Sequence, residues 1–399
     1  MEKKQRRFEE ESVPTKIWNK TFISVFITNM LMYLGMQMCN TLVGKYANHI
    51  GASAAVVGTV TSLFAVTAIV FKMISAPAID TFNRKYILAG AMVVIATALF
   101  GYSLSASIPM LMSFRLLQGA GQAFTATCCL ALATDSLPLD RLSTGIGYFS
   151  LAQATCQAIG PTIGLKLSDT IGYQKTFAVG ACFLLLGAYA ALHIKIKFKH
   201  TRKFRISPGS IIAKEAIIPA IIMFFLCMAY YNITSFLAIY GEQQGVGSNI
   251  GFFFTVYAVT LLFSRPIIGQ ISDKYGHVRV LIPALCCFAL AFLMISFSHN
   301  LVMFLISAFI SAFGYGACQP AVQALCMKLV PKDKRGAGSC TSYIGQDLGN
   351  LVGPMIAGGI VDRMGYSNMW RIMIFPVFLA MIVVILYRKQ ITEAGKEGS

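Results

Sequence analysis

An aspartate inside a long apolar stretch is the first residue that points to chemistry. The chain has 16 acidic residues, and Asp347 is the one that lies near the middle of such a stretch, 337–361. An ionisable side chain at this depth in a membrane is costly and marks a functional site by default. Loss of water favours the neutral form of a carboxyl group, so Asp347 can carry a proton or bind a cationic substrate. The alternative is a protonated aspartate that hydrogen-bonds between helices.

Arg115 is the second candidate, and it lies in the apolar stretch 109–133. Gln118 and Gln122 follow it at i+3 and i+7, which places all three side chains on one helical face. The guanidinium can attract a substrate charge or balance Asp347, and we expect it to be the partner of that carboxylate. The alternative is that Arg115, about two turns from a helix end, extends its charge to the membrane surface.

Amide and tyrosine side chains form a third set, which we expect to line a cavity for a small molecule. Asn29, Tyr33 and Gln37 recur every four residues and therefore share a helix face. Hydrogen bonding between helices is an equally good use for each member of the set. The other members are Gln153, Gln157, Tyr231, Asn232, Gln346 and Asn350.

Long apolar helices are needed to position these side chains, and the amino-acid composition predicts such helices. Hydrophobic residues make up 56% of the 399 residues, charged residues make up 12%, and the mean hydropathy is +0.67. Soluble domains carry about 25% charged residues, and a helix needs roughly 20 apolar residues to cross a bilayer. The sequence therefore predicts an all-α membrane protein with twelve transmembrane helices. We place them at 17–41, 55–77, 86–106, 109–133, 144–165, 176–194, 215–240, 249–271, 280–298, 301–327, 337–361 and 369–388.

An internal repeat divides these helices into two groups of six. A shift of 193 residues superposes punctuating residues of the first part on those of the second: Lys72 on Arg265, Asp80 on Asp273, Gly160-Pro161 on Gly353-Pro354, Asp169 on Asp362, and Gly172-Tyr173 on Gly365-Tyr366. We therefore expect an N-terminal half at 1–194, a basic linker at 195–214 and a C-terminal half at 215–399. Two six-helix halves related by an axis along the membrane normal are a transporter architecture.

The formal net charge of +17 reflects membrane topology rather than nucleic-acid binding. With twelve spans, roughly 25 of the 33 lysines and arginines fall on the side of the termini and about 5 on the other side. The positive-inside rule then predicts cytoplasmic N- and C-termini in the cell membrane. The basic linker is expected to contact lipid headgroups.

Two sequence motifs resemble signatures of the major facilitator superfamily. The first signature has the form G-x-L-x-D-x-x-G-R-K and resembles the segment with Gly269, Asp273 and Gly276. The first-half copy keeps Asp80, Arg84 and Lys85 and has Asn83 in place of a glycine, and asparagine is the next best residue for a left-handed backbone. The segment from Arg115 to Gln122 resembles the second signature, R-x-x-Q-G-x-G.

The resemblance implies that these charged loops gate the movement of the two halves. Contacts between an aspartate, a cation and a neighbouring helix end can latch the halves in one state and release in another. The gating group comprises Lys72, Asp80, Arg84, Lys85, Arg265, Gly269, Asp273 and Gly276.

Glycine and proline repeat in the fifth and eleventh spans and resemble the antiporter signature of drug and metabolite exporters. Small residues permit close helix packing and proline bends a helix, so we expect packing and bending roles for Gly160, Pro161, Gly164, Gly349, Gly353 and Pro354.

Enzyme and cofactor signatures are missing from the sequence. No G-x4-G-K-[ST] loop or H-E-x-x-H motif occurs, and the 11 cysteines form no C-x-x-C pair. We expect no catalytic residue, cofactor or metal site. The resemblance implies a secondary transporter, acting as a monomer, that exports a small molecule by alternating access in exchange for protons. The alternatives are a uniporter or symporter that imports a small organic metabolite or anion, and a membrane receptor or scaffold that transports nothing.

Overall fold

Helices make up all the regular structure of the computed structural model, which describes residues 16–138, 142–194, 213–330 and 335–396. The first group of helices is α2 (Lys20–His49), α3 (Ala54–Ser62), α4 (Phe64–Thr81), α5 (Arg84–Leu104), α6 (Ile108–Asp135), α7 (Leu142–Ile171) and α8 (Tyr173–Leu192). The second group is η3 (Lys214–Ala216), α9 (Ile217–Gln243), η4 (Gly247–Gly251), α10 (Phe252–Tyr275), α11 (His277–Ser296), α12 (Leu301–Leu329), α13 (Arg335–Ile372), α14 (Ile374–Leu386) and α15 (Arg388–Lys396).

The helix lengths account for the predicted spans. Ten segments of the described chain are long and apolar enough to cross a membrane. One of them, Cys340–Leu386, contains two predicted spans, because α13 changes direction at Gly365 and α14 follows directly. The 30-residue α7 provides the remaining long helix. The prediction of an all-α, multi-pass membrane protein is confirmed.

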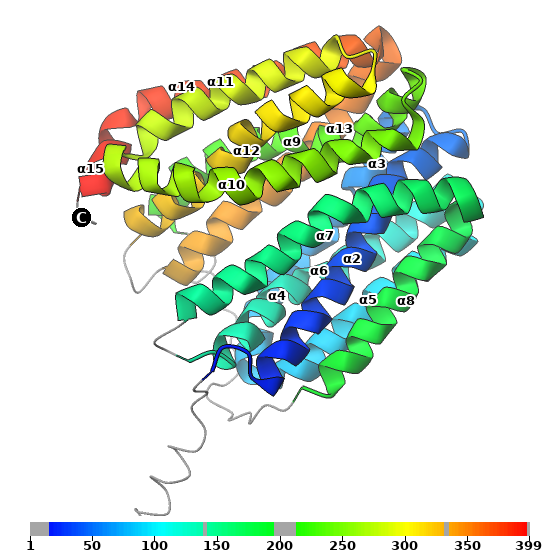
Figure 1. The fold of residues 1–399 in the computed structure, drawn as a ribbon, viewed down its shortest axis with the longest axis horizontal. Helices are drawn as coiled ribbons and strands as arrows, with labels where there is room; N and C mark the ends of the chain where they lie inside the picture. Colours follow the sequence, from blue (N-terminus) through cyan, green and yellow to red (C-terminus); the bar gives the residue numbers. More distant parts are fainter. Residues whose placement is uncertain (1–15, 139–141, 195–212, 331–334, 397–399) are drawn as a thin grey trace, which may run out of the picture.

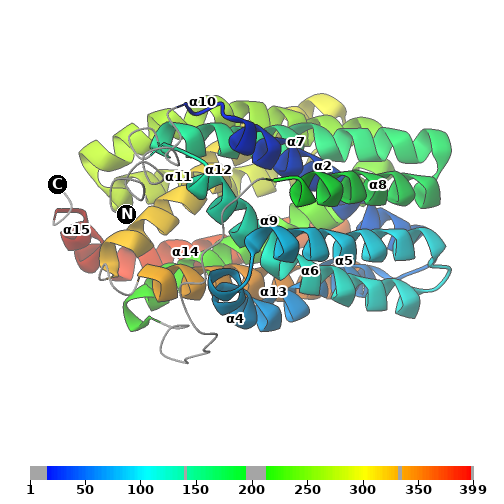
Figure 2. The same cartoon turned by 90° about the horizontal axis from the view of Figure 1, so that it is seen from below.

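The helices form two bundles that lie against each other (Figure 1). In the first bundle α2 packs on α7 and α8, and α5 packs on α6 and α8. In the second bundle α9 packs on α13, and α12 packs on α10 and α11. Figure 2 shows most of these helices running in roughly the same direction, so each bundle extends from one side of the molecule to the other. The residue bounds of the halves stay a prediction, because most of the linker lies outside the described residues.

Two helix junctions carry the internal repeat into the backbone. Gly172, between α7 and α8, has φ +84°, and Gly365, 193 residues later, has φ +79°. Only glycine adopts this left-handed conformation without strain. The junctions before α5 and α11 differ. Gly276 has φ +88°, whereas Asn83 has φ −67° and its side chain caps α5 by accepting a hydrogen bond from the Lys85 amide.

The two bundles meet most closely on the side of the membrane remote from Lys20 and Leu386, which we term the far side; the opposite side is the terminal side. Gly58 on α3 lies against the carbonyl of Pro354, and Gly358 on α13 lies against the carbonyl of Ala54. Neither glycine has room for a Cβ atom. On the same side, Gly251 of η4 packs on Thr162 of α7. Backbone contact at these points brings the halves together at the far side.

Candidate functional site

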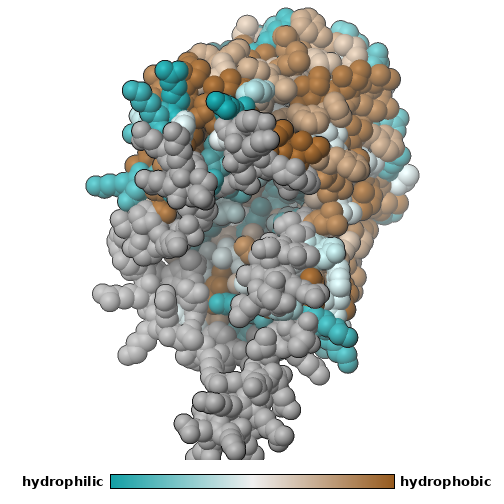
Figure 3. All heavy atoms as spheres, turned by 60° about the vertical axis from the view of Figure 1, so that its left-hand side comes forward, coloured by the Kyte–Doolittle hydropathy of each residue, from teal (hydrophilic) through white to brown (hydrophobic). Residues whose placement is uncertain are grey.

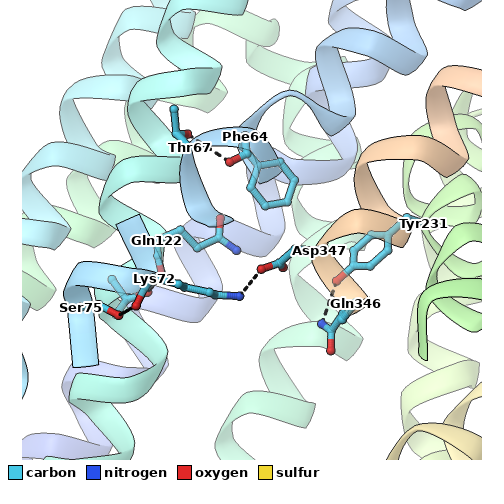
Figure 4. Close-up of polar contacts among 9 residues, drawn as sticks. Phe64, Thr67, Lys72, Ser75, Gln122, Tyr231, Gln346 and Asp347 are labelled. Carbon is cyan, nitrogen blue, oxygen red and sulfur yellow. Dashed lines mark hydrogen bonds and ion pairs between the residues drawn. The ribbon is translucent and has the colours of Figure 1, made fainter. Parts of the chain in front are cut away.

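An ion pair joins the two halves near the middle of the helices. Nζ of Lys72 on α4 donates to Oδ2 of Asp347 on α13 at 2.5 Å (Figure 4). Asp347 follows the first residue of α13 by twelve positions, which is about 18 Å along the helix at 1.5 Å per residue. The side chain of Lys72 is 27% exposed and that of Asp347 is 9% exposed. The pair is thus a mid-membrane bridge with one partner open to water.

Lys72, not Arg115, is the partner of Asp347, so the partner expected from the sequence was wrong. From the sequence, Lys72 is placed in the gating group, and the repeat superposes it on Arg265. Its ammonium also lies 5.4 Å from the ring centre of Tyr343, one turn before Asp347. The ring face of tyrosine attracts a cation. Lys72 therefore belongs to the central site.

Arg115 is held inside the first bundle by hydrogen bonds that leave no charge partner beside it among the described residues. Its guanidinium donates to the carbonyls of Val60 and Thr61 at 3.2 and 2.8 Å, and to Oε1 of Gln118 at 2.5 Å. A fourth bond reaches Oδ1 of Asn40 at 3.3 Å. The residue is 3% exposed, so it does not extend to the membrane surface. Arg115 ties α6 to the end of α3, where the helix is interrupted before α4.

Amide groups surround the central ion pair. Nε2 of Gln346 donates to the hydroxyl of Tyr231 at 3.2 Å, and Figure 4 shows Gln122 beside Lys72 and Asp347. The Oε1 atoms of Gln122 and Gln346 are buried and accept no hydrogen bond within the described part of the chain. Asn350, one turn after Gln346, is 3% exposed. Unused acceptors in a half-buried site favour a ligand that brings N–H or O–H donors.

Tyrosine rings form one wall of the second bundle close to this pair. The rings of Tyr230 and Tyr315 stack with centroids 3.8 Å apart and planes 5° apart. Tyr231 meets Tyr230 edge to face at 5.6 Å, and its hydroxyl takes the bond from Gln346. Tyr315 is 4% exposed, so the partly buried Tyr230 and Tyr231 are the rings that can offer apolar area to a bound molecule. The sequence pointed to Tyr231 but gave no sign of the stack on Tyr315.

The remaining cavity candidates are spread over the first bundle and α9. Nε2 of Gln153 donates weakly to Oδ1 of the fully buried Asn29, at 3.5 Å. Asn232 donates to the carbonyl of Met228 on its own helix at 2.8 Å. The other positions are Tyr33 and Gln37, which are partly buried, and Gln157, which is exposed. The structure thus gathers Gln122, Gln346 and Tyr231 at the ion pair and gives Asn29 and Asn232 contacts within the bundles.

Apart from Lys72, the described side chains of the gating group, Arg84 and Lys85, lie at the terminal side. Arg84 forms an ion pair with Asp135 at the end of α6, and its Nε donates to the carbonyl of Ile79 at 3.3 Å. Lys85 lies 4.9 Å from the ring centre of Tyr86. These contacts stay within the first half. The side chains of Asp80, Arg265 and Asp273 and the surroundings of Gly269 lie outside the part of the chain that the structure describes.

The glycines of α7 and α13 for which the sequence predicts packing roles lie where helices of the same bundle touch. Gly160 and Gly164 face Gln37 and Met38 on α2, and Gly353 faces the carbonyl of Met228 on α9. Gly349 faces Phe224 of the same helix. Pro161 and Pro354 lie inside their helices, one residue after Gly160 and Gly353.

Polar contacts between the halves reinforce the backbone packing at the far side. The carboxylate of Asp362 on α13 accepts hydrogen bonds from the amides of Ala54 and Ala55 at 2.8 and 2.9 Å, and so caps α3. Nζ of Lys45 lies 3.7 Å from Asp169 in its own half and 3.4 Å from Glu242 in the other. The repeat singled out Asp169 and Asp362, but no sequence pattern gave them these partners.

A recess opens between the halves on the terminal side. Figure 3, turned toward that side, shows a hollow between the two masses with hydrophilic residues within it. On the inner faces, Tyr343 is 45% exposed and Lys72 remains partly exposed. The molecule is therefore closed at the far side and open at the terminal side, with the ion pair in between.

Comparisons with known proteins agree with this architecture. The family model described as Major Facilitator Superfamily matches residues 25–248 and 219–398. The chain is 24% identical over 326 residues to the "Multi-drug resistance efflux pump PmrA homolog" of Lactococcus lactis subsp. lactis (strain IL1403), covering 77% of this chain and 78% of the relative. It is 22% identical over 352 residues to "Multidrug resistance protein 1" of Bacillus subtilis (strain 168), covering 85% and 90%.

A solved structure shows the same fold. A bacterial homologue of the human lysosomal transporter Spinster, described as inward-facing and unoccupied, superposes with a TM-score of 0.76 at 15% identity. The superposition covers 96% of this chain and 99% of the other. Because the family model spans nearly all of the chain, this protein belongs to the Major Facilitator Superfamily and is a multi-pass membrane transporter, not an enzyme.

Proposed function

We propose that the protein is a secondary active transporter that exports a small molecule across the cytoplasmic membrane in exchange for protons. The observation that carries the proposal is the 2.5 Å contact between Lys72 and Asp347, which joins the halves at mid-membrane and lies next to the recess. Such a carboxylate has three competing partners: the lysine, a proton and a cationic group of the substrate. Competition for one carboxylate is the simplest way to couple two opposite fluxes.

The orientation of the protein in the membrane is inferred from the sequence, and the direction of transport is inferred from its relatives. The positive-inside rule makes the terminal side cytoplasmic, so the recess takes substrate from the cytoplasm. The printed names of two relatives describe efflux or multidrug resistance, which supports export of small molecules by this chain as well. Protons then enter from outside when the far side opens and the terminal side closes.

The proposed cycle uses the two charges of the central site in turn. Open to the cytoplasm, Asp347 exchanges its proton for substrate. After the halves rock, a proton from outside binds Asp347 and releases the substrate. The titratable side chains nearest to this carboxylate are Lys72, Tyr231 and Tyr343, with the thiols of Cys227 and Cys340 close by. Lys72 is the one cation among these neighbours, and its charge favours the ionised form of the carboxylate.

The test is proton release from everted vesicles that hold an imposed pH gradient, challenged with cationic, neutral and anionic compounds. We expect at least one compound to drive proton flux in the wild type. Asp347→Asn keeps the shape of the side chain but cannot exchange a proton, so it should abolish the flux. Asp347→Glu is the matched control, since it keeps a titratable carboxyl group and should retain part of the flux.

Two results would count against the proposal. Full proton flux in Asp347→Asn would move coupling to another residue. No flux with any compound, in vesicles that contain folded protein, would favour facilitated import or a protein that transports nothing.

A further inference from the structure

Within the part of the chain that the structure describes, the charges of the central site balance each other. One ammonium, Lys72, and one carboxylate, Asp347, face each other from opposite halves, and the carboxylate is 9% exposed. Arg115 lies in its own network of backbone and amide acceptors within the first bundle. A ligand that enters the site therefore meets one positive and one negative group.

A ligand with one charge breaks this balance. A cation that takes Asp347 leaves the ammonium of Lys72 without a partner in a site of low polarity, and an anion that takes Lys72 does the same to Asp347. Breaking a buried ion pair by satisfying only one partner carries the cost of an uncompensated charge. A ligand with both charges gives each group a new partner. The four-carbon stem of Lys72 is flexible enough to follow the acidic group of such a ligand.

The uncharged neighbours fit the same kind of ligand. The Oε1 atoms of Gln122 and Gln346 are buried and accept no bond within the described part of the chain. Figure 4 shows both turned away from Asp347, so rotation of either amide would let its oxygen accept from an ammonium group at that carboxylate. Tyr231 places its ring beside Gln346, and Tyr230 adds a stacked pair with Tyr315. A cation held near these rings gains from their negative faces, and an apolar body can lie on them.

We propose that the transported molecule is a zwitterion, with an amine that binds Asp347 and the two glutamines, an acidic group that binds Lys72, and an apolar or aromatic body that lies against the tyrosines. The proposal rests on the proposed function, because it names the substrate class of the same site. A zwitterion carries no net charge across the membrane, so the exchanged protons alone carry the charge of each cycle.

The test compares matched probes on the purified protein at pH 7. The zwitterionic probe is 4-(aminomethyl)benzoic acid; its methyl ester is the cation of the same shape, and benzoate is the anion. Binding is measured by equilibrium dialysis in detergent. We expect the zwitterion to bind at least roughly tenfold more tightly than the ester or benzoate, since each of these leaves one charge unpaired.

Two variants separate this charge pairing from general affinity. Lys72→Met removes the partner of the acidic group, so the zwitterion should lose its advantage and the ester should bind as well or better. The double variant Lys72→Asp with Asp347→Lys restores one charge of each sign and should recover the preference for the zwitterion. That recovery would also show that loss in the single variant is not a folding defect.

The proposal is overturned if the ester binds the wild type as tightly as the zwitterion, if Lys72→Met keeps the preference, or if the zwitterion fails to bind at about 10 mM, a level that detects even very weak ligands. Proton exchange driven by the ester, without a preference for the zwitterion, would sink this inference and leave the proposed function standing. Selective binding of the zwitterion without proton exchange by any compound would support the substrate class and overturn the proton-coupled function.

Discussion

Removal of the Asp362 carboxylate should open the far side of the transporter. Its two oxygens accept from the amides of Ala54 and Ala55 at 2.8 and 2.9 Å, and these atoms belong to different halves. The first amides of a helix have no partner within the helix, so a side-chain acceptor stabilises them. Asp362→Ala removes both acceptors and the favourable charge at the start of α3.

The magnitude follows from the geometry and the exposure. Loss of a helix cap costs about 0.5–2 kcal/mol, and a hydrogen bond to a charged group contributes about 1.5–3 kcal/mol when buried. Asp362 is exposed, so water replaces part of each bond and we take about 1–2 kcal/mol for the pair. If the bonds exist only when the far side is closed, the open population rises by about 5- to 30-fold.

Hydrogen–deuterium exchange of the protein in lipid nanodiscs measures this change. Amides of residues 54–56 report the cap itself, and amides of residues 247–255 report a separate contact between the halves, where η4 packs on α7. We expect faster exchange in both segments. Ser53→Ala is the matched control, because Ser53 also caps α3, at 3.4 Å from the Val56 amide, but lies in the same half. It should speed exchange in residues 54–56 alone.

A local response in both variants would refute this reasoning. If Asp362→Ala leaves residues 247–255 unchanged, the carboxylate stabilises α3 without holding the halves together. In that case the closed far side would depend on backbone packing and on Lys45.

The remaining predictions concern packing and the buried arginine. Gly58→Ala places a Cβ against the α13 backbone and should hinder closure of the far side, which lowers transport by about tenfold or more at equal expression, since overpacking costs about 1–3 kcal/mol. Gly90→Ala is its control, because a Cβ there meets nothing within 4 Å and transport should be unchanged. Arg115→Met removes four hydrogen bonds, two of them to the carbonyls of Val60 and Thr61, and should lower the apparent melting temperature in detergent by several degrees. Arg115→Lys should restore only part of it, because one ammonium cannot reach all four groups. Equal melting temperatures for Arg115→Met and wild type would show that the network contributes little to stability.

The number and type of the helices could be predicted because the membrane imposes length and apolarity on each span. Their ends could not, since caps and interhelical contacts set them. The first span was expected to end near residue 41, but α2 continues to His49. Lys45, in these two extra turns, is 6% exposed and is balanced by Asp169 and Glu242. In a sequence pattern, a cation after an apolar stretch indicates the end of a span. Here the helix continues past the cation, because the fold places Asp169 and Glu242 beside Lys45.

The central carboxylate could be found in the sequence and its partner could not. Asp347 stands out because its depth within a span follows from counting residues. Lys72 lies 275 positions earlier, and only the packing of α4 against α13 brings the two together. Arg115 was the more obvious cation, but it is held by carbonyls at the α3–α4 interruption, a break that has no glycine or proline to reveal it.

Two kinds of contact between the halves act on different steps of the proposed cycle. Asp362 and the glycine packing hold the far side closed, and they contain no group that the substrate touches. The Lys72–Asp347 pair bridges the halves at the site itself, so it resists their separation whenever the carboxylate has neither a proton nor a substrate. A proton neutralises Asp347 at the cost of leaving the ammonium of Lys72, which is 27% exposed, without its counter-charge, and a zwitterion gives each charge a separate partner. Either event breaks the bridge. An empty, deprotonated transporter keeps it. Under the proposed function, the transporter therefore changes state when Asp347 holds a proton or when the site holds substrate. It does not change state when both are absent, which is the condition that obligatory exchange requires.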